Sequence, residues 1–358
     1  MKTSFKYVLA AAGGLLLIGG LLCFIALAAG GFRMESLNNE GPWEEKVFSC
    51  PADKVSEVYV RTRDFDMTVE PWDGSEVEIR YYINENVEYE ESFEGGVMRL
   101  VRTPLDITRR WFVMGFRSER LTVRVRVPAG RQLIGDFGST NDNIAVSGLA
   151  FDTLNIKTSN GRIAVKDVTV AGELKLKSTN DNLTLENISA AGRVEGITSN
   201  GRVSAASLRC KDLELRSTND NLSLTDVLCL ESAQLHSTNG VLRLERVNVP
   251  RITGSTTNDN IDFSGLEFQN ATFTSTNGRI TGSLPGPEED YAITASTTNG
   301  RVNAGGLRNN GEKILSLRTT NDSIRVTFGG EKTFVLEDDI FFGLPEPEDP
   351  PEPPDVFD

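Results

Sequence analysis

The stretch DLELRSTNDNL at residues 212–222 is one copy of a motif that recurs along most of this chain. Closely similar segments are TLNIKTSNGRI at 153–163 and ELKLKSTNDNL at 173–183. Apolar and polar residues alternate on both sides of the central asparagine, and a period of two is typical of β-strands with one buried face. Each copy therefore predicts two strands joined by a short turn.

Ten asparagines mark the motif at steps of 19 to 22 residues within the segment 136–330. In every copy the residue two positions earlier is Ser or Thr, and the residue three positions later is aliphatic. The asparagines are Asn141, Asn160, Asn180, Asn200, Asn219, Asn239, Asn258, Asn277, Asn299 and Asn321. This regularity favours an all-β, single-chain β-solenoid (β-helix) of about ten coils, in which equivalent residues stack about 4.8 Å apart. Asn-Gly turns also fit a meander or a propeller, but the near-constant step disfavours both.

Stacked asparagines predict a hydrogen-bonded ladder. We expect each asparagine to point inward and to bond through its amide to the asparagines above and below it. The Ser or Thr two positions earlier has the same inward parity. The residue after the asparagine is Gly or Asp, which turn the chain because they tolerate positive φ. Asn-Asp copies alternate with Asn-Gly copies from 141 to 277, and we interpret the alternation as keeping like charges off adjacent coils.

The N-terminus carries the signal for cellular location. Residues 1–6 contain Lys2 and Lys6, and the segment 7–32 has no charged residue over 26 positions. A run of this length can cross a membrane as one helix, and the flanking lysines predict a cytoplasmic N-terminus. We therefore expect a single-pass protein of the cell membrane whose body is extracytoplasmic. A cleaved signal peptide is the alternative, since ALA at 26–28 resembles a cleavage site.

The remaining segments differ in composition from the repeats. Residues 33–54 resemble a polar stalk, and 55–135 contain alternating patterns that predict a β-rich entry or cap segment. Residues 331–358 form an acidic, Pro-rich tail with ten Asp or Glu and one Lys, which predicts an extended, solvated end. The formal net charge of −14 argues against a nucleic-acid partner.

Several motifs together resemble one known family. They are the uncharged N-terminal segment, VYVRTRDFDMTVEPWDGSEVEIRYY at 58–82, VRVRVPAG at 123–130, and the repeated STNGRI coils. This combination resembles the bacterial putative-adhesin family of unknown function, the DUF4097 class, over roughly 55–330. The resemblance implies a β-helical envelope protein, and it implies no catalytic residues.

These observations predict a non-enzymatic, membrane-tethered cell-surface β-solenoid that acts as an adhesin or envelope-binding scaffold. Its expected partner is cell-wall polymer, a glycan or another envelope protein. An envelope-stress or assembly component that binds a membrane protein through the entry segment is the alternative. A carbohydrate-active β-helix enzyme ranks third.

The turn aspartates test the enzymatic alternative. They fall on alternate coils, about 10 Å apart, beyond the roughly 5–9.5 Å that separates paired catalytic carboxylates. These residues are Asp142, Asp181, Asp220 and Asp259. No metal or other cofactor is expected, because the Gly-rich nonapeptide of calcium-binding β-rolls is absent.

Two further features carry specific expectations. RRWFVMGFR at 109–117 predicts a loop at the membrane interface with Trp111, Phe112 and Phe116 in contact with lipid, or alternatively a strand that caps the first coil. Cys210 and Cys229 each lie ten residues after a ladder asparagine, so they share one inward column on adjacent coils. We expect buried thiols there, with a disulfide as the alternative, and a more exposed Cys50.

Overall fold

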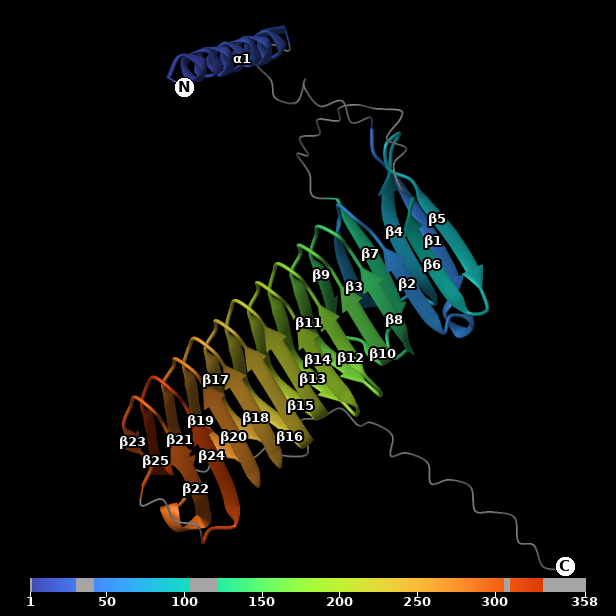
Figure 1. Cartoon of the computed structure of the whole chain (residues 1–358). Coiled ribbons are helices and arrows are strands. Elements are labelled where there is room, and N and C mark those ends of the chain that lie inside the picture. The colour runs from blue at the N-terminus through green and yellow to red at the C-terminus, as the bar shows by residue number, and fades with distance from the viewer. Residues whose placement is uncertain (1, 30–41, 104–120, 306–309, 331–358) are drawn as a thin grey trace, which may run out of the picture.

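The computed structural model describes residues 2–29, 42–103, 121–305 and 310–330, and it shows a long stack of β-coils (Figure 1). The predicted interface loop with Trp111, Phe112 and Phe116 lies outside these residues, as does the acidic tail. Helix α1 (Lys2–Ala29) occupies most of the segment predicted to be helical. By the usual measure of length and apolarity, no helix within the described residues qualifies as a membrane span.

The β-solenoid of about ten coils is confirmed. Each coil contributes one strand before its asparagine and one after it, and the strands of successive coils pair in parallel. The pre-turn face contains β8 (Gln132–Gly138), β10 (Ala150–Lys157), β12 (Leu174–Lys177), β14 (Arg193–Ile197), β18 (Arg251–Thr256), β20 (Asn270–Ser275), β22 (Tyr291–Ser296) and β24 (Lys313–Arg318).

The post-turn face contains β9 (Ile144–Ser147), β11 (Ile163–Val170), β13 (Leu183–Ala190), β17 (Leu242–Asn248), β19 (Ile261–Glu267), β21 (Ile280–Pro285), β23 (Val302–Asn303) and β25 (Ile324–Gly330). Two long strands, β15 (Val203–Ser217) and β16 (Leu222–Ser237), begin on this face and continue into the pre-turn face.

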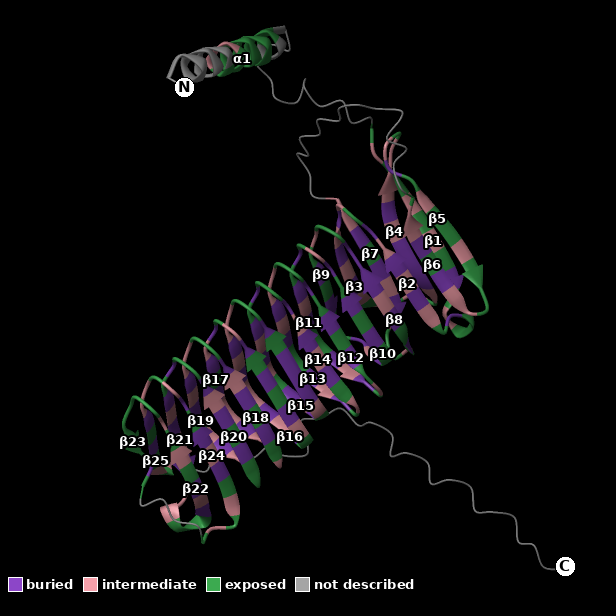
Figure 2. Cartoon of the chain, viewed as in Figure 1, coloured by how far each residue is buried: buried purple, intermediate pink, exposed green. Residues whose placement is uncertain are grey.

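One continuous apolar core fills the space between the faces (Figure 2). The aliphatic residue three positions after each asparagine stacks in register, as in Leu222, Leu242 and Ile261, and all three are fully buried. From Phe151 to Phe268 the column ten positions after the asparagine is also buried, and it contains Cys210 and Cys229. The predicted register is therefore confirmed, with the two thiols free and their sulfur atoms 3.6 Å apart.

A second corner, which was not predicted from the repeat, lies seven residues after the asparagine in seven successive coils. The residue there has a φ between 51° and 67°, in the left-handed region. Its occupants are Gly148, Asp167, Asn187, Ser207, Asp226, Arg246 and Gly265. Inward residues lie five and eight positions after the asparagine, and an odd spacing of three cannot come from simple alternation. The left-handed residue is the one extra residue between these two inward positions, as in a β-bulge.

The entry segment is continuous with the solenoid. Its strands are β1 (Glu44–Pro51), β2 (Glu57–Arg61), β3 (Asp66–Trp72), β4 (Glu76–Ile83), β5 (Tyr89–Glu94), β6 (Val97–Arg102) and β7 (Thr122–Pro128), with a short 3₁₀ helix η2 (Ala52–Lys54). β2 pairs in parallel with β8, and β3 with β9, so these two strands form one more coil. The antiparallel pairs β1–β4, β4–β7 and β5–β6 close this end of the stack. The predicted division at 135/136 falls inside β8.

The coil formed by β2 and β3 contains a degenerate copy of the repeat. Asp64 takes the place of the ladder asparagine, with Thr62 two positions before it and Met67 three positions after it, both buried. Asn141 donates its backbone N–H to the Arg63 carbonyl 3.0 Å away, as each later asparagine does to its neighbouring coil. The aspartate hides this copy from a search for asparagine.

Two expectations about the segment before residue 55 were wrong. Residues 44–54 are not stalk, because β1 pairs with β4 along its whole length and η2 follows directly. Cys50 is not exposed, because it pairs with Val77 and faces the core with 6% of its surface accessible. Both errors arise because this strand precedes the repeats, and its partner lies about thirty residues further along the chain.

The last two coils stack in the reverse of their sequence order. β24 lies between β20 and β22, and β25 lies between β21 and β23. The chain therefore builds the terminal coil first, passes through the 3₁₀ helix η3 (Glu288–Asp290) on the way, and then returns to fill the gap (Figure 1). At this end the order of the coils in the stack therefore differs from their order in the sequence.

Candidate functional site

The ten repeat asparagines form a hydrogen-bonded ladder along one edge of the stack. Each amide nitrogen donates to the amide oxygen of the asparagine on the neighbouring coil, at 2.6–2.9 Å. The ladder follows the spatial order, so Asn321 bonds to Asn277 and Asn299 bonds to Asn321. At the other end Asn141 donates to the Asp64 carboxylate at 2.7 Å. All donors therefore point toward the N-terminal end, and a carboxylate accepts the last bond.

The expected inward placement of these asparagines is wrong, because all ten are exposed. The pre-turn strands end before the asparagine, so the alternation of the strand does not extend to it. The Ser or Thr two positions earlier is the inward residue. In one copy, Ser217 donates to the Gly201 carbonyl of the preceding coil at 2.9 Å and accepts from the Asp220 N–H at 3.2 Å. The buried hydroxyl thus ties two coils together while the amides lie at the surface.

Steric contact between adjacent turns explains the alternation of Gly and Asp. A Cβ atom at Gly240 would lie 2.0 Å from the Asp220 carbonyl oxygen, and equivalent overlaps exist at Gly161, Gly201, Gly278 and Gly300. The charge interpretation is therefore incomplete, since alternate turns need glycine to clear the neighbouring backbone.

The same contact rationalises the reversed coils. In sequence order the last three turns read Gly278, Gly300, Asp322, which breaks the alternation. In the stack, Asp322 lies between the two glycines, and its carbonyl oxygen is 2.1 Å from the Cβ position of Gly300. Alternation is restored by the folded order.

Asp64 at the end of the ladder is held as a carboxylate. Its burial raises its pKa, but hydrogen bonds from Asn141 and Arg102 and the positive charges of Arg102 and Arg63 lower it by more, so the net pKa lies below the usual value. The ladder is thereby terminated by an acceptor that carries a full charge.

A second exposed column runs beside the asparagines. The residue immediately before each ladder asparagine is Ser or Thr in all ten copies, and each is exposed or half-buried. None of these ten hydroxyls forms a hydrogen bond with any part of the chain that the structure describes. They are Thr140, Ser159, Thr179, Ser199, Thr218, Thr238, Thr257, Thr276, Thr298 and Thr320. We call the ten asparagines and these ten residues together the asparagine ridge.

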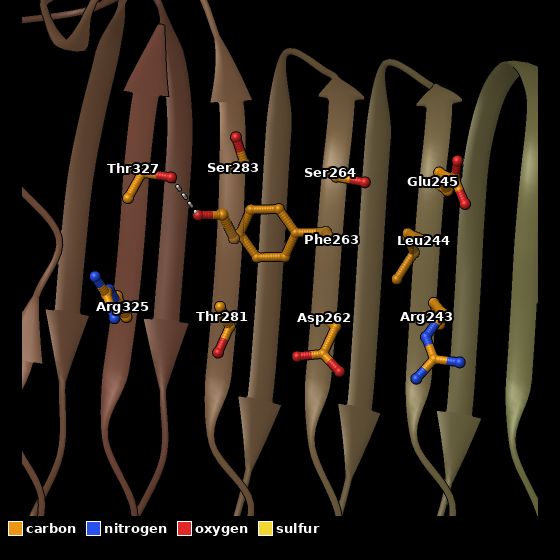
Figure 3. Close-up of a pocket in the computed structure, with 11 residues that line it drawn as sticks. Arg243, Leu244, Glu245, Asp262, Phe263, Ser264, Thr281, Ser283, Arg325 and Thr327 are labelled. Carbon is orange, nitrogen blue, oxygen red and sulfur yellow. Dashed lines mark hydrogen bonds between the residues drawn. The ribbon is translucent and has the colours of Figure 1, made fainter. Parts of the chain in front are cut away.

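The post-turn face contains a depression near the C-terminal end, with a volume of about 400 Å³. Its outward side chains form two rows across β17, β19, β21 and β25 (Figure 3). One row is Arg243, Asp262, Thr281, Arg325, and the other is Glu245, Ser264, Ser283, Thr327. We call this depression the polar groove. The repeat pattern did not predict this groove, although the short side chains at the outward positions of two successive coils indicate a depression in the surface.

The inward residues beneath the polar groove fix its floor. The Phe263 ring stacks on Phe273 at a centroid distance of 5.1 Å, and it fills the space that a side chain at Gly282 would need. Thr327 donates from its hydroxyl to the Gly282 carbonyl at 3.4 Å. The strands under the groove are thus held by core packing and by the backbone hydrogen bonds between parallel strands.

No group of three or more His, Cys, Asp or Glu side chains within the described ranges is arranged to hold a metal ion. The single histidine, His236, contacts the Ser255 hydroxyl at 2.8 Å on the open pre-turn face. Catalytic serine and histidine pairs need a third group to orient the ring and a site for the substrate carbonyl. The contacts of His236 supply neither.

The family model described as Toastrack DUF4097 matches residues 55–327. The chain belongs to this family. The match begins after β1 and ends in β25, so it includes the asparagine ladder of the Toastrack solenoid and all of the polar groove. The predicted membership of the DUF4097 family is thereby confirmed.

Three solved structures that match this Toastrack chain share little sequence with it. A putative adhesin from Bacteroides fragilis is 13% identical, with 80% of this chain and 97% of that chain covered and a TM-score of 0.35. A putative adhesin from Parabacteroides merdae is 13% identical, with 81% and 97% covered and a TM-score of 0.40. A putative cell adhesion protein from Clostridium sporogenes is 9% identical, with 80% and 100% covered and a TM-score of 0.22. No curated protein matches the chain.

Proposed function

We propose that this Toastrack protein is a non-enzymatic, adhesin-like scaffold, tethered to the cell membrane, whose solenoid presents a repetitive polar surface outside the cell. Cell-wall polymer, a glycan or another envelope protein is the proposed partner. The observation that carries the proposal is the asparagine ridge, in which ten coils present the same hydroxyl and amide pair in one unbroken line.

Regular spacing makes the ridge suited to a repeating partner. Adjacent coils are separated by about 4.8 Å, the spacing of paired strands. The ladder amides bond to one another, so the position of each is held by its neighbours, whereas the hydroxyls beside them are available to a ligand. A partner with regularly placed hydrogen-bonding groups can then contact many coils at once, and weak contacts add up through multivalency.

The proposed tether is the N-terminal segment. The 26 residues of 7–32 are uncharged, and Lys2 and Lys6 precede them, which is the pattern of a helix inserted with its N-terminus in the cytoplasm. Expression of the full chain in a bacterial host, followed by alkaline carbonate extraction, tests this part. Retention of the protein in the membrane pellet supports the tether, and full release into the supernatant contradicts it.

Binding by the full chain in lipid nanodiscs tests the scaffold. Isolated bacterial envelope material is expected to retain the wild-type protein, and Thr218→Gln together with Thr257→Gln is expected to weaken retention because both residues lie on the asparagine ridge. The matched control is Thr253→Gln with Thr272→Gln, which changes exposed threonines of the pre-turn face. Equal retention of the ridge and control variants, or no retention of the wild-type protein, would contradict the proposal.

A further inference from the structure

Charge pairing in the solenoid changes along the stack. In the middle coils several arginines are paired, as Arg193 and Arg216 are with Glu214, and Arg246 is with Asp226. Arg162 and Arg243 are the exceptions without an ion pair among the described residues of these coils. After Arg246, none of the arginines that the structure describes has an ion pair; these are Arg251, Arg279, Arg301, Arg318 and Arg325. Because an unpaired guanidinium keeps five donors available, the C-terminal coils differ chemically from the rest of a chain with a net charge of −14.

The polar groove lies at the start of this region and is bounded by two arginines, Arg243 just before it and Arg325 within it. Arg243 on β17 and Arg325 on β25 are both exposed, and neither has a hydrogen bond or ion pair within the described residues. The register places them in one row, three strand spacings apart, which corresponds to about 14 Å. The groove is therefore long enough for more than one sugar ring and has a free cation at each end.

Short polar side chains form the surface between the two arginines. Thr281 and Ser283 project from β21, and Ser264 and Asp262 project from β19, with all of these pointing to the outer side of the sheet (Figure 3). Asp262 forms no ion pair with Arg243, although the two are partners in register. Hydroxyl groups both donate and accept hydrogen bonds, and a carboxylate accepts them from sugar hydroxyls. No aromatic side chain faces outward here, because the Phe263 ring is buried.

From this arrangement we infer that the polar groove binds a segment of an acidic polysaccharide, with its anionic groups on Arg243 and Arg325 and its hydroxyls on Thr281, Ser264 and Asp262. A guanidinium binds carboxylate and phosphate through the same paired donors, so the anion is a sugar carboxylate or a phosphodiester. The inference rests on the proposed scaffold function and specifies the partner: an anionic glycan that crosses the post-turn face.

Three polymers of matched length test whether the ligand must be anionic and which anionic group it carries. Binding of each polymer is measured by titration calorimetry with the full chain in nanodiscs. They are an oligogalacturonate, an oligosaccharide whose sugars are joined by phosphodiesters, and a neutral malto-oligosaccharide. Binding of either anionic polymer with no measurable binding of the neutral one is expected, and the tighter anionic polymer identifies the anion. Equal binding of the neutral and anionic polymers, or no binding of either anionic polymer, overturns the inference.

Variants locate the site. Arg243→Gln and Arg325→Gln are each expected to weaken binding roughly ten- to a hundredfold, the size expected for loss of a hydrogen bond to a charged group. Arg162→Gln is the matched control, because Arg162 is an exposed, unpaired arginine in a turn many coils away. Circular dichroism melting confirms that each variant is folded. If all three variants bind the anionic polymer like the wild type, the groove is not the site.

Comparison with envelope retention separates this inference from the scaffold proposal. Groove variants that lose the anionic polymer but keep part of their envelope retention support both, because the asparagine ridge is intact. Unchanged envelope retention and unchanged polymer binding in the groove variants overturn the groove assignment and leave the scaffold proposal standing. The wild-type protein could instead bind the anionic polymer but not envelope material. That result would contradict the scaffold proposal and support the groove assignment.

Discussion

Replacement of Gly240 by Ala adds a single methyl group in a turn where the neighbouring backbone leaves no room. The added Cβ would lie 2.0 Å from the Asp220 carbonyl oxygen and 2.3 Å from its carbonyl carbon. Gly240 does not have a positive φ, so alanine is compatible with its backbone conformation, and the predicted effect comes from steric overlap alone. Glycine to alanine at an uncrowded position normally stabilises a protein by about 0.4–1 kcal/mol through the unfolded state. The predicted sign is therefore opposite to the usual one.

The magnitude follows from what must move. The Asp220 carbonyl accepts a hydrogen bond from the Ser237 hydroxyl at 3.2 Å, and the Asp220 N–H donates to Ser217 at 3.2 Å. Relief of the overlap requires a shift of this tied backbone, for which overpacking typically costs about 1–3 kcal/mol. Loss of the Ser237 hydrogen bond adds about 0.5–1.5 kcal/mol. Together these give roughly 2–4 kcal/mol, or a fall in Tm of roughly 4–16 °C for a domain of this size.

Thermal melting of the full chain in nanodiscs, followed by circular dichroism of the β-signal, measures the effect. Asp220→Ala is the matched control, because it places alanine at the same turn position of the adjacent coil, where a Cβ is already present. The control loses the side-chain bond to the Asn221 N–H and a solvent-exposed contact with Arg202 at 3.9 Å. An exposed ion pair contributes little stability, so the Tm of the control should fall by much less. A Gly240→Ala variant that melts at or above the wild-type temperature would refute the steric explanation of the alternating turns.

Three further outcomes follow from the same structure. Ser217→Ala should lower the free energy of unfolding by about 1–3 kcal/mol because it leaves buried partners unsatisfied, whereas Asn219→Ala, at the surface, should lower it by about 1 kcal/mol or less. Urea denaturation of both variants checks this order, and a larger loss of stability in Asn219→Ala would contradict it. The pKa of Asp64 is lower in the folded chain, so the carboxylate stabilises the fold above its unfolded pKa of about 3.9, and this contribution is lost as the pH falls through the lower folded value. Asp64→Asn should therefore flatten the dependence of Tm on pH below about pH 4. An unchanged dependence would count against Asp64 as the charged end of the ladder. Cys210 and Cys229 are both buried, and the hydrogen bond between the thiols together with burial raises the pKa of Cys229. Because burial excludes the reagent, neither thiol should react with maleimide until the chain unfolds. Mass spectrometry of the labelled peptides checks this, and early labelling of either cysteine would show the column register to be wrong.

The coil itself could be predicted because it is a local unit that recurs. Alternation of apolar residues on both sides of the asparagine identifies the strands, and a constant step places equivalent residues in one column. Cys210 and Cys229 were placed on adjacent coils by counting alone, and their Cα atoms are paired in the structure. The family assignment also came from short motifs that retain their order along the chain.

The polar groove could not be derived in the same way. It depends on which coils are neighbours, because Arg325 reaches the groove only when β25 pairs with β21. In simple sequence order, the coil of β23 would take that place and would present different side chains. The repeat identifies inward and outward positions, but the composition of an outward surface depends on the stacking order.

Sequence alone determines the period of the coil and the buried columns, since hydrophobic burial acts on each repeat through its own alternating pattern. The order of the final coils, in contrast, depends on contacts between turns that become neighbours only in the stack. Backbone atoms of one turn exclude a Cβ from the next, and this constraint acts only after stacking. The identities of Gly278, Asp322 and Gly300 satisfy this steric constraint, but the alternation of Gly and Asp is visible only when the turns are compared in their order along the stack.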